Sequence, residues 1–485
     1  MRSRLFAPEL RKWWTLFAVA FGLFMIMLDN TVVNVALPSI RQDLGISISE
    51  LEWVVNGYAL TFGVLLLTGG KLADMLGRRR IFMIGLVIFT ASSFFCGFAN
   101  SAGVLIAARV VQGSGAALMN PATLSIIVAT FPPRQRGTAI GIWAGVSAMA
   151  LAIGPLVGGA ITEHVNWSWV FYINVPIGIL GLFAARIFID ESKDTREQRL
   201  DLPGLVTSAG ALFALTYGLI ESNKRGWGDP FVLGLFAVAA VLFVAFILLE
   251  RHQRLPMLDL NLFRNRSFSS ANAVMFLIGL AMFGVFFFVS LYVQNVLGFS
   301  PIQAGATFLP MTMCIVFVAP VAGRLADKVG PRRLMVPGLS LVTISLVLFS
   351  LLNESSTFWT LLPALLVGGI GMAMSMSPTT TAAMHAVPVE KAGVGSAVIN
   401  SMRQVGGSVG IALMGAIVAT QFNASRPNPH DFVNGFQLGL RVAAGIAFAG
   451  VFVAAFGIKP EQLRHDAPEP KQPQPAREGE IAISP

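Results

Sequence analysis

Residues 70–80 read Gly-Lys-Leu-Ala-Asp-Met-Leu-Gly-Arg-Arg-Arg, and residues 323–333 read Gly-Arg-Leu-Ala-Asp-Lys-Val-Gly-Pro-Arg-Arg. The two stretches are identical at seven of eleven positions, and each follows the second apolar segment of a series of six. Such a repeat indicates that the chain consists of two related halves. Related halves around a central cavity are typical of membrane proteins that work by alternating access.

The segments around these two stretches are long and apolar. Hydrophobic residues make up 55% of the 485 residues and charged residues 12%, against about 25% charged residues in soluble domains. Because a helix needs about 20 mostly apolar residues to cross a bilayer, the sequence predicts fourteen spans. Their limits are roughly 13–37, 51–69, 81–99, 103–131, 137–161, 167–189, 203–221, 231–249, 268–296, 301–323, 334–352, 358–384, 393–420 and 436–457.

The repeat and the spans predict an all-α integral membrane protein made of two six-helix bundles with two additional transmembrane helices between them. We expect an N-terminal bundle at residues 13–190, the inserted helices at 203–250 and a C-terminal bundle at 266–458. Residues 459–485 are rich in proline and charge, so we expect a disordered cytoplasmic tail.

The basic residues predict the orientation. Of the 34 Lys and Arg residues, 26 fall on one side of the predicted spans and four on the other. Because basic loops stay on the cytoplasmic side, both termini are expected in the cytoplasm of a cell, at the plasma or inner membrane. The net charge of +9 is then a topology signal, and no nucleic-acid partner is expected.

Two of the charged residues inside predicted spans are candidates for proton coupling. Asp29, in the first span, is expected to be the only carboxylate deep within the fourteen. An ionised carboxylate there costs at least about 2.5–3.5 kcal/mol, which favours a group that takes up and releases a proton. Arg109, in the fourth span, is the natural counter-charge. The alternative for Asp29 is a carboxylate held permanently in an ion pair, and the alternative for Arg109 is a side chain that reaches to the membrane surface. For Arg403, in the thirteenth span, we weigh the functional role and the surface-reaching role equally.

The repeated loops are candidates for a gate. The residues concerned are Gly70, Asp74, Gly77 and Arg78 in the first copy, and Gly323, Asp327 and Gly330 in the second. An aspartate near a helix start can accept backbone N–H bonds, and the glycines permit a tight turn. The alternative is that the arginines only anchor the loops on the basic side, which we favour for Arg79 and Arg80.

Small residues recur at four-residue spacing in the fifth span. This spacing lets two helices approach closely, and it covers Gly145, Gly154, Pro155, Gly158 and Gly159. The spacing by itself predicts packing and nothing more specific.

Polar residues near Asp29 are candidates for the wall of a substrate cavity: Asn30, Asn34, Asn56, Tyr58 and Gln112. The 37 Phe and 19 Met residues supply adaptable apolar surface that suits varied substrates, although packing and lipid contact explain most of them. Cys96 and Cys314 each lie in an apolar segment, so neither a disulfide nor a metal site is expected.

Four features together resemble the major facilitator superfamily, and within it the fourteen-span drug–proton antiporters (EmrB/QacA type). They are the repeated loop, Leu28–Pro38 (LDNTVVNVALP), Arg109–Ala117 (RVVQGSGAA) and the glycine-rich run Gly145–Gly159. The resemblance implies that Arg109 helps to move the proton, that the loops gate, and that the fifth-span motif belongs to an antiporter. Members that handle divalent cations carry further acidic residues, and the tenth span here has none, which puts dicationic substrates in doubt.

These observations predict a proton-coupled efflux transporter for lipophilic drugs or other small amphiphiles, working as a monomer among membrane lipids. The alternative is an exporter or flippase of an endogenous lipid or secreted metabolite, which would need the same motifs. The resemblance argues against a proton-coupled importer or uniporter, and a receptor would not need both Asp29 and two gating loops. No paired carboxylates, nucleophile, metal-ligand cluster or phosphate-binding loop occurs in the sequence. We therefore expect no enzyme activity, no catalytic residue and no metal or cofactor beyond the proton as coupling ion.

Overall fold

The computed structural model describes residues 8–193, 201–253, 256, 258–387, 392–421 and 429–458, and in them every regular element is a helix. In chain order the elements are α2 (Pro8–Leu44), α3 (Ile48–Leu76), α4 (Arg78–Gly97), α5 (Ala102–Thr130), α6 (Pro133–His164), α7 (Trp169–Tyr172), α8 (Asn174–Phe188), α9 (Leu202–Arg225), α10 (Pro230–His252), the 3₁₀ helix η1 (Leu260–Arg264), α11 (Arg266–Asn295), α12 (Pro301–Thr307), α13 (Leu309–Val329), α14 (Arg332–Phe349), α15 (Phe358–His385), α16 (Ala392–Gln421) and α17 (Pro429–Gly457).

Thirteen stretches of the described chain are helical, long and apolar enough to cross a membrane. The short helices α7 and α12 are each the first part of such a stretch, which continues into α8 or α13. The fifth predicted span, 137–161, coincides with α6, but several α6 side chains lie outside the described residues. The count of fourteen therefore stays a prediction, and so do the domain limits. The predicted tail, 459–485, lies outside the described residues.

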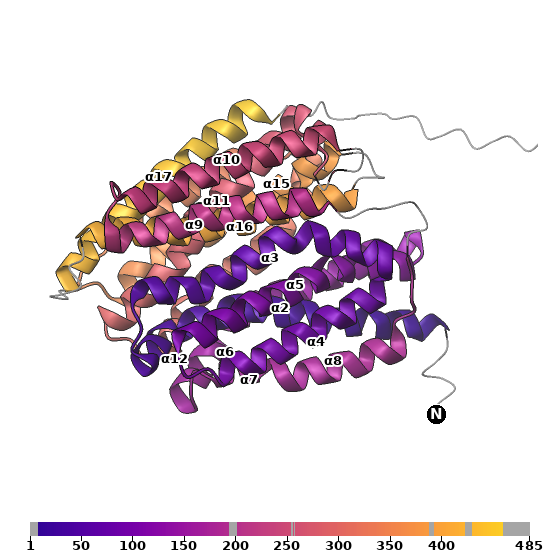
Figure 1. The fold of residues 1–485 in the computed structure, drawn as a ribbon, viewed down its shortest axis with the longest axis horizontal. Coiled ribbons are helices and arrows are strands. Elements are labelled where there is room, and N and C mark those ends of the chain that lie inside the picture. The colour runs from indigo at the N-terminus through magenta and orange to yellow at the C-terminus, as the bar shows by residue number, and fades with distance from the viewer. Residues whose placement is uncertain are drawn as a thin grey trace, which may run out of the picture.

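The helices pack in two bundles that repeat one pattern (Figure 1). In the first bundle α5 packs on α3 and α4, while α2 packs on α6 and α8. In the second, α15 packs in the same way on α13 and α14, while α11 packs on α16 and α17. The internal repeat seen in the loop sequences thus extends to the packing of whole helices.

The two repeated loops lie at the same end of the molecule as the start of α2, which we call the basic end; the other is the far end. Each loop turns at a glycine with left-handed backbone geometry, Gly77 with φ 112° and Gly330 with φ 89°. Side chains other than glycine rarely adopt such angles. The glycines that the sequence singled out therefore end α3 and α13 and let α4 and α14 begin at once.

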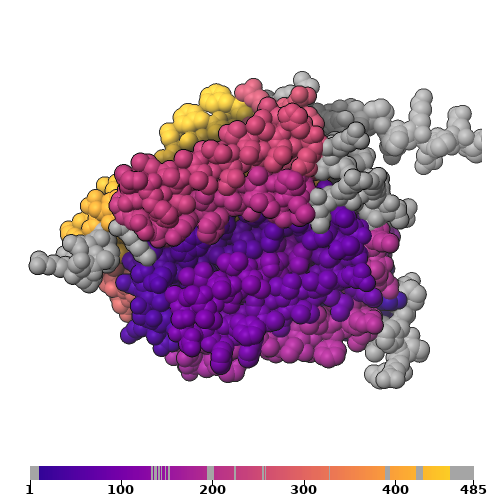
Figure 2. Space-filling view, in the orientation of Figure 1, coloured from indigo at the N-terminus to yellow at the C-terminus, as the bar shows by residue number. Residues whose placement is uncertain are grey.

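The inserted helix α9 packs across the seam between the bundles, against α3 of the first and α16 of the second. The ring of Trp53 on α3 lies 5.7 Å from that of Phe213 and 5.9 Å from that of Tyr217, both on α9. In Figure 2 the magenta residues of this region form a continuous surface above the indigo first bundle. The insertion thus covers one side of the seam.

The two bundles are joined at the far end. In the described part of the chain, their hydrogen bonds include Ser290 Oγ to Asn34 O at 2.7 Å and Gln294 Nε2 to Val35 O at 3.0 Å. At the last turn of α6, Glu163 accepts from Ser300 Oγ at 2.6 Å and from the Ile302 backbone N–H at 2.9 Å. The bond from Ser300 holds the pKa of the exposed Glu163 carboxyl below its usual range. The molecule is therefore closed at its far end.

Candidate functional site

The first bundle holds a buried ion pair between Asp29 on α2 and Arg109 on α5. Arg109 Nη1 lies 2.5 Å from Asp29 Oδ2, and both side chains are shielded from solvent. A short, charge-assisted bond of this kind is among the strongest polar contacts in proteins. The structure thus brings together the two residues that the sequence made candidates for proton coupling, and Arg109 is buried against Asp29 instead of reaching to a membrane surface.

Neutral polar residues surround the pair. Gln112 Nε2 donates to Asp29 Oδ1 at 3.0 Å and to Ser93 Oγ at 3.2 Å, while Gln112 Oε1 accepts from Arg109 at 2.7 Å. Asn174 Nδ2 donates to Ser93 Oγ at 3.0 Å and lies 3.5 Å from Asp29 Oδ1. Helices α2, α4, α5 and α8 each contribute a member of this network. Three side chains, those of Arg109, Gln112 and Asn174, thus donate hydrogen bonds to the Asp29 carboxylate.

Arg109 also has partners that do not depend on Asp29. Its Nε donates to the Val54 carbonyl oxygen at 3.1 Å, and its guanidinium carbon lies 4.2 Å from the centre of the Tyr58 ring. Cation–π contacts of this kind are worth about 2 kcal/mol or more when shielded from water. Arg109 is therefore held in place by contacts other than the ion pair as well.

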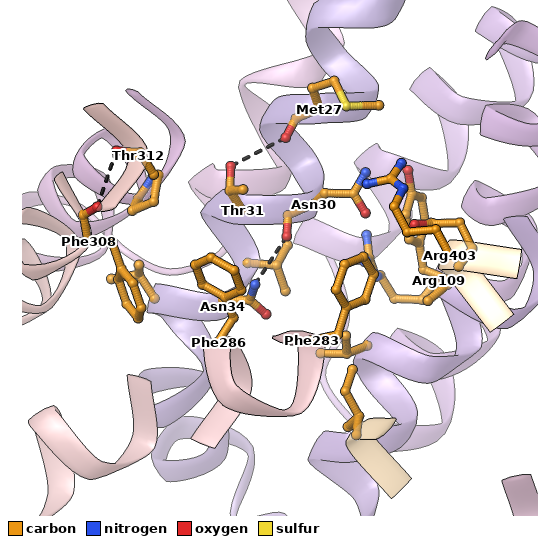
Figure 3. A pocket seen from close by; sticks show the side chains of 18 residues that line it. Met27, Asn30, Thr31, Asn34, Arg109, Phe283, Phe286, Phe308, Thr312 and Arg403 are labelled. Carbon is orange, nitrogen blue, oxygen red and sulfur yellow. Dashed lines mark hydrogen bonds between the residues drawn. The ribbon is translucent and has the colours of Figure 1, made fainter. Parts of the chain in front are cut away.

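A cavity adjoins the pair, and Arg109 is part of its wall. Figure 3 shows Phe283, Phe286 and Phe308 along this cavity, with Arg109 and Arg403 at one side. Its lining residues are Met27, Asn30, Thr31, Val33, Asn34, Val35, Val55, Tyr58, Ala59, Arg109, Pro155, Phe283, Phe286, Phe308, Thr312, Arg403, Gln404 and Ile411. Both bundles contribute, so relative motion of the bundles would change the shape of the cavity.

The five predicted cavity residues have two different locations. Asn30, Asn34 and Tyr58 line the cavity, and both asparagines donate to their own helix, to Ile26 O at 2.8 Å and Asn30 O at 3.1 Å. Asn56 instead accepts from Ser408 of the second bundle at 3.0 Å, and Gln112 belongs to the network around the ion pair. Neither of these two is among the lining residues of the cavity, and both amides have partners within the protein, as buried amides usually do.

In the first gating loop, Arg78 connects three parts of the basic end. It lies 3.0 Å from Asp74, its Nη1 lies 3.5 Å from the Ser125 carbonyl oxygen on α5, and its backbone N–H donates to Ser192 O at 2.8 Å. A side chain at Gly70 would contact Pro121 of α5 at 3.4 Å. The loop thus fixes the end of α3 to α5 and to the chain after α8.

The expectation that Asp74 lies near a helix start is wrong. Asp74 is in the last turn of α3, and its carboxylate accepts from Arg78. The carboxylate at the start of α4 is Glu191, which accepts from the backbone N–H groups of Arg79 and Arg80 at 3.1 and 3.2 Å. Helix starts favour carboxylates because their N–H groups lack partners within the helix.

The second gating loop repeats the geometry of the first in its backbone. Gly330 ends α13, and a side chain at Gly323 would approach Ser377 Oγ of α15 to 2.8 Å. The side chain of Asp327 lies outside the described residues. The equivalence of the two aspartates therefore rests on the sequence.

The small residues of α6 serve two contacts. Side chains at Gly154 and Gly158 would overlap Thr31 and Val32 of α2 in the same bundle. A side chain at Gly159 would overlap Pro301 of α12, and a side chain at Gly305 of α12 would overlap Pro155. A side chain at Gly145 would meet no atom of the described residues within 4 Å. One face of helix α6 thus contacts α2 of its own bundle, and the adjacent face contacts α12 of the other bundle.

We expect Gly159→Ala to lower transport by roughly tenfold or more, because overpacking costs about 1–3 kcal/mol and opposes closure of the far end. Gly145→Ala, on the same helix, is the matched control and should transport like the wild type. The measurement is the initial efflux rate per molecule of protein in membrane vesicles. Equal rates for the two variants would contradict a role of this contact in the transport cycle.

A second carboxylate, which the sequence did not single out, is buried near the end of a span. Glu52, near the start of α3, is fully buried. Gly415 of α16 leaves the room that its carboxylate occupies. Glu52 lies at the margin of an apolar segment, where one sequence does not distinguish a carboxylate at the membrane surface from one buried between helices.

Ser93 and Asn174 belong to the network around the ion pair although the sequence did not single them out. Cys96 is buried, with its Sγ 3.6 Å from Gln112 Oε1. The available signal was a single polar residue inside an apolar run. That signal marks a buried hydrogen-bond donor without saying which helix holds the acceptor.

A cavity between two repeated helical bundles, with a buried ion pair at its wall, defines a multi-pass membrane transporter. The chain belongs to the Major Facilitator Superfamily, whose profile matches residues 19–411. Membership indicates a transporter rather than an enzyme.

Several relatives are resistance and export proteins. The chain is 38% identical over 437 residues to a tetracenomycin C resistance and export protein of Streptomyces glaucescens, covering 90% of this chain and 81% of that protein. It is 37% identical over 451 residues to a puromycin resistance protein of Streptomyces alboniger, covering 91% and 89%. A bacterial homolog of the human lysosomal transporter Spinster has the same fold, with a TM-score of 0.67 at 17% identity over 92% of this chain and 98% of that one.

Proposed function

We propose that this chain exports lipophilic small molecules in exchange for protons and belongs to the fourteen-span drug–proton antiporters. The observation that carries the proposal is the buried Asp29–Arg109 pair, whose arginine lines the cavity. The relatives named for resistance to tetracenomycin C and puromycin support drug-like substrates.

The proton is the proposed coupling ion, and Asp29 is its carrier. With the far end closed, Asp29 is ionised and held by Arg109, Gln112 and Asn174; this form has released its proton and accepts substrate from the basic end. When the far end opens, a proton neutralises Asp29. Arg109 then keeps its contacts with Val54 and Tyr58, so that protonation does not leave a buried cation without partners.

Export requires the basic end to face the cytoplasm, as the distribution of Lys and Arg predicts. The proposed transporter is a monomer in the plasma or inner membrane with both termini inside. Everted vesicles, whose cytoplasmic face points outward, therefore accumulate the exported compound in their lumen.

Export or flipping of an endogenous lipid or secreted metabolite is the second candidate. The phenylalanines along the cavity would hold an acyl or polycyclic body as well as a drug. The Asp29 cycle is common to both candidates, so only the substrate separates them.

The test is uptake of a compound panel, including tetracenomycin C, puromycin and a fluorescent phospholipid, by everted vesicles with and without an acidic lumen. We expect accumulation of at least one compound, and its loss when the pH gradient is collapsed. Accumulation of the phospholipid alone would favour the second candidate. Uptake that does not respond to the pH gradient would contradict proton coupling.

A further inference from the structure

We propose that Arg403 binds an acidic group of the substrate, so that the preferred cargo is a lipophilic molecule with one anionic end. This inference rests on the proposed efflux function and assigns its substrate class. It starts from the charges in the cavity wall.

Two cationic side chains line the cavity, Arg109 and Arg403. The charge of Arg109 is compensated by Asp29 at 2.5 Å. The lining includes no carboxylate among the described residues, and within that part of the chain the Arg403 guanidinium makes no hydrogen bond or ion pair. The wall therefore presents one uncompensated positive charge.

A second donor lies beside Arg403. Gln404, its neighbour on α16, lines the cavity and is buried, and its Nε2 has no hydrogen-bond partner among the described residues. Buried amide donors are normally satisfied, and charged groups inside a membrane protein are rare and mark substrate or ion pathways. The two neighbouring donors are suited to oxygen acceptors that only a bound molecule supplies.

The chemistry of a guanidinium selects the ligand. Its planar set of N–H groups matches the two oxygens of a carboxylate, and it binds phenolate or phosphate oxygens in a similar way. A cationic group at the same position would be repelled by Arg403 and would gain nothing from Arg109, which is already paired. An acidic group therefore fits this part of the wall best.

The rest of the wall suits an apolar body. Phe283 and Phe286 of α11 lie beyond the arginines in Figure 3, and the Phe286 ring is 5.4 Å from that of Phe308. Thr312, farther along, already donates to the Phe308 carbonyl oxygen at 3.2 Å. The cavity thus has a cationic end and an aromatic end, which together match an amphiphile with its acid at one terminus.

Three probes that share a pyrene body and differ only at the end of the chain test this assignment: pyrenebutyrate, pyrenebutanol and pyrenebutyl-trimethylammonium. Their affinities are measured on the purified full-length protein in lipid nanodiscs. For the wild type we expect pyrenebutyrate to bind more tightly than the other two. Arg403→Gln should weaken pyrenebutyrate roughly tenfold or more, as loss of a charge-assisted bond does, and should change pyrenebutanol by less than about threefold.

Two further variants control for folding and for charge in general. Arg441→Gln removes an arginine of α17 that does not line the cavity, and it should bind all three probes like the wild type. Arg403→Lys keeps the charge without the planar group, so its affinity for pyrenebutyrate should fall between wild type and Arg403→Gln. Thermal melting of each variant shows whether it is folded. If Arg403→Gln is not folded, the affinity of Arg403→Lys for pyrenebutyrate tests the assignment instead.

The inference is overturned if the trimethylammonium probe binds the wild type more tightly than pyrenebutyrate, or if Arg403→Gln affects all three probes equally. The proposed function is tested separately, by export of the same probes under a pH gradient. Selective binding of pyrenebutyrate without pH-driven export would uphold the anion site and reject proton coupling. If pyrenebutanol is exported under the pH gradient and Arg403→Gln does not change the binding of pyrenebutyrate, proton-coupled export is upheld and the anion site is rejected.

Discussion

Asp29→Asn should abolish pH-driven efflux while leaving exchange down a substrate gradient. Asparagine has almost the same size as aspartate but does not titrate, so the bundles can still move although no proton is carried. Each pH unit is worth about 1.36 kcal/mol, or roughly tenfold accumulation for one exchanged proton. We expect this accumulation to disappear in everted vesicles, while counterflow of labelled against unlabelled substrate persists.

The single variant leaves Arg109 without its anion, and breaking a buried pair costs about 3–5 kcal/mol. The control is therefore Asp29→Asn combined with Arg109→Gln, which removes both charges of the pair. We expect the double variant to fold better than the single one and to remain uncoupled. Full pH-driven efflux by either variant would reject Asp29 as the carrier and direct attention to another carboxylate, Glu52 among them.

The charge of the cargo decides which gradient drives the wild type. Exchange of one proton for a monovalent cation moves no net charge, so the membrane potential contributes nothing. Exchange for a neutral molecule moves one charge and exchange for a monoanion moves two, each worth about 2.3 kcal/mol per 100 mV. The acidic cargo inferred from Arg403 thus predicts export that is driven more strongly by the potential than export of a neutral analogue.

Asp74→Asn should reduce transport by roughly tenfold or more while leaving expression and substrate affinity near normal. The Asp74–Arg78 pair is partly exposed, and pairs of that kind contribute about 0–1 kcal/mol to stability. Its loss releases the Arg78 side chain from the position in which Nη1 reaches the Ser125 carbonyl oxygen on α5. The measurement combines the initial efflux rate with equilibrium binding of the same compound.

Asp190→Asn is the matched control, since Asp190 pairs with Arg11 at the same end of the molecule at 2.5 Å and lies outside both gating loops. It should transport normally. Asp327→Asn should have a smaller effect than Asp74→Asn, because Pro331 stands where the first copy has Arg78. Negligible effects of both loop variants would reduce the loops to anchors of topology.

The sequence predicted the features that repeat or that conflict with a membrane environment. The duplicated loops indicated two halves, and the cost of burying a charge singled out Asp29 and Arg109, which the structure places in contact. The partners Val54, Ser93 and Asn174 come from three other helices. Their positions depend on the rotation of each helix about its axis, which apolar spans with little periodicity do not reveal.

Two cavity candidates that do not line the cavity, Asn56 and Gln112, illustrate the same limit. Asn56 and Gln112 lie one turn or less from cavity-lining positions in sequence, yet Asn56 faces Ser408 and Gln112 faces Asp29. Successive residues of a helix point in directions about 100° apart. A neighbour of a cavity-lining residue can therefore face another helix instead of the cavity. The role of Arg403 was left open for the same reason, and only the joint geometry of the two bundles brings it and Gln404 to the same cavity as Asn30 and Asn34.

The most direct test of the account is whether substrate movement drives proton movement in the opposite direction. Purified protein is reconstituted into liposomes that contain a pH-sensitive dye, with the compound that the wild type exports fastest placed on one side only. We predict that its flow through the wild type moves protons the other way and changes the luminal pH, and that Asp29→Asn gives no such change. Substrate flow through the wild type without any change of luminal pH would contradict proton coupling.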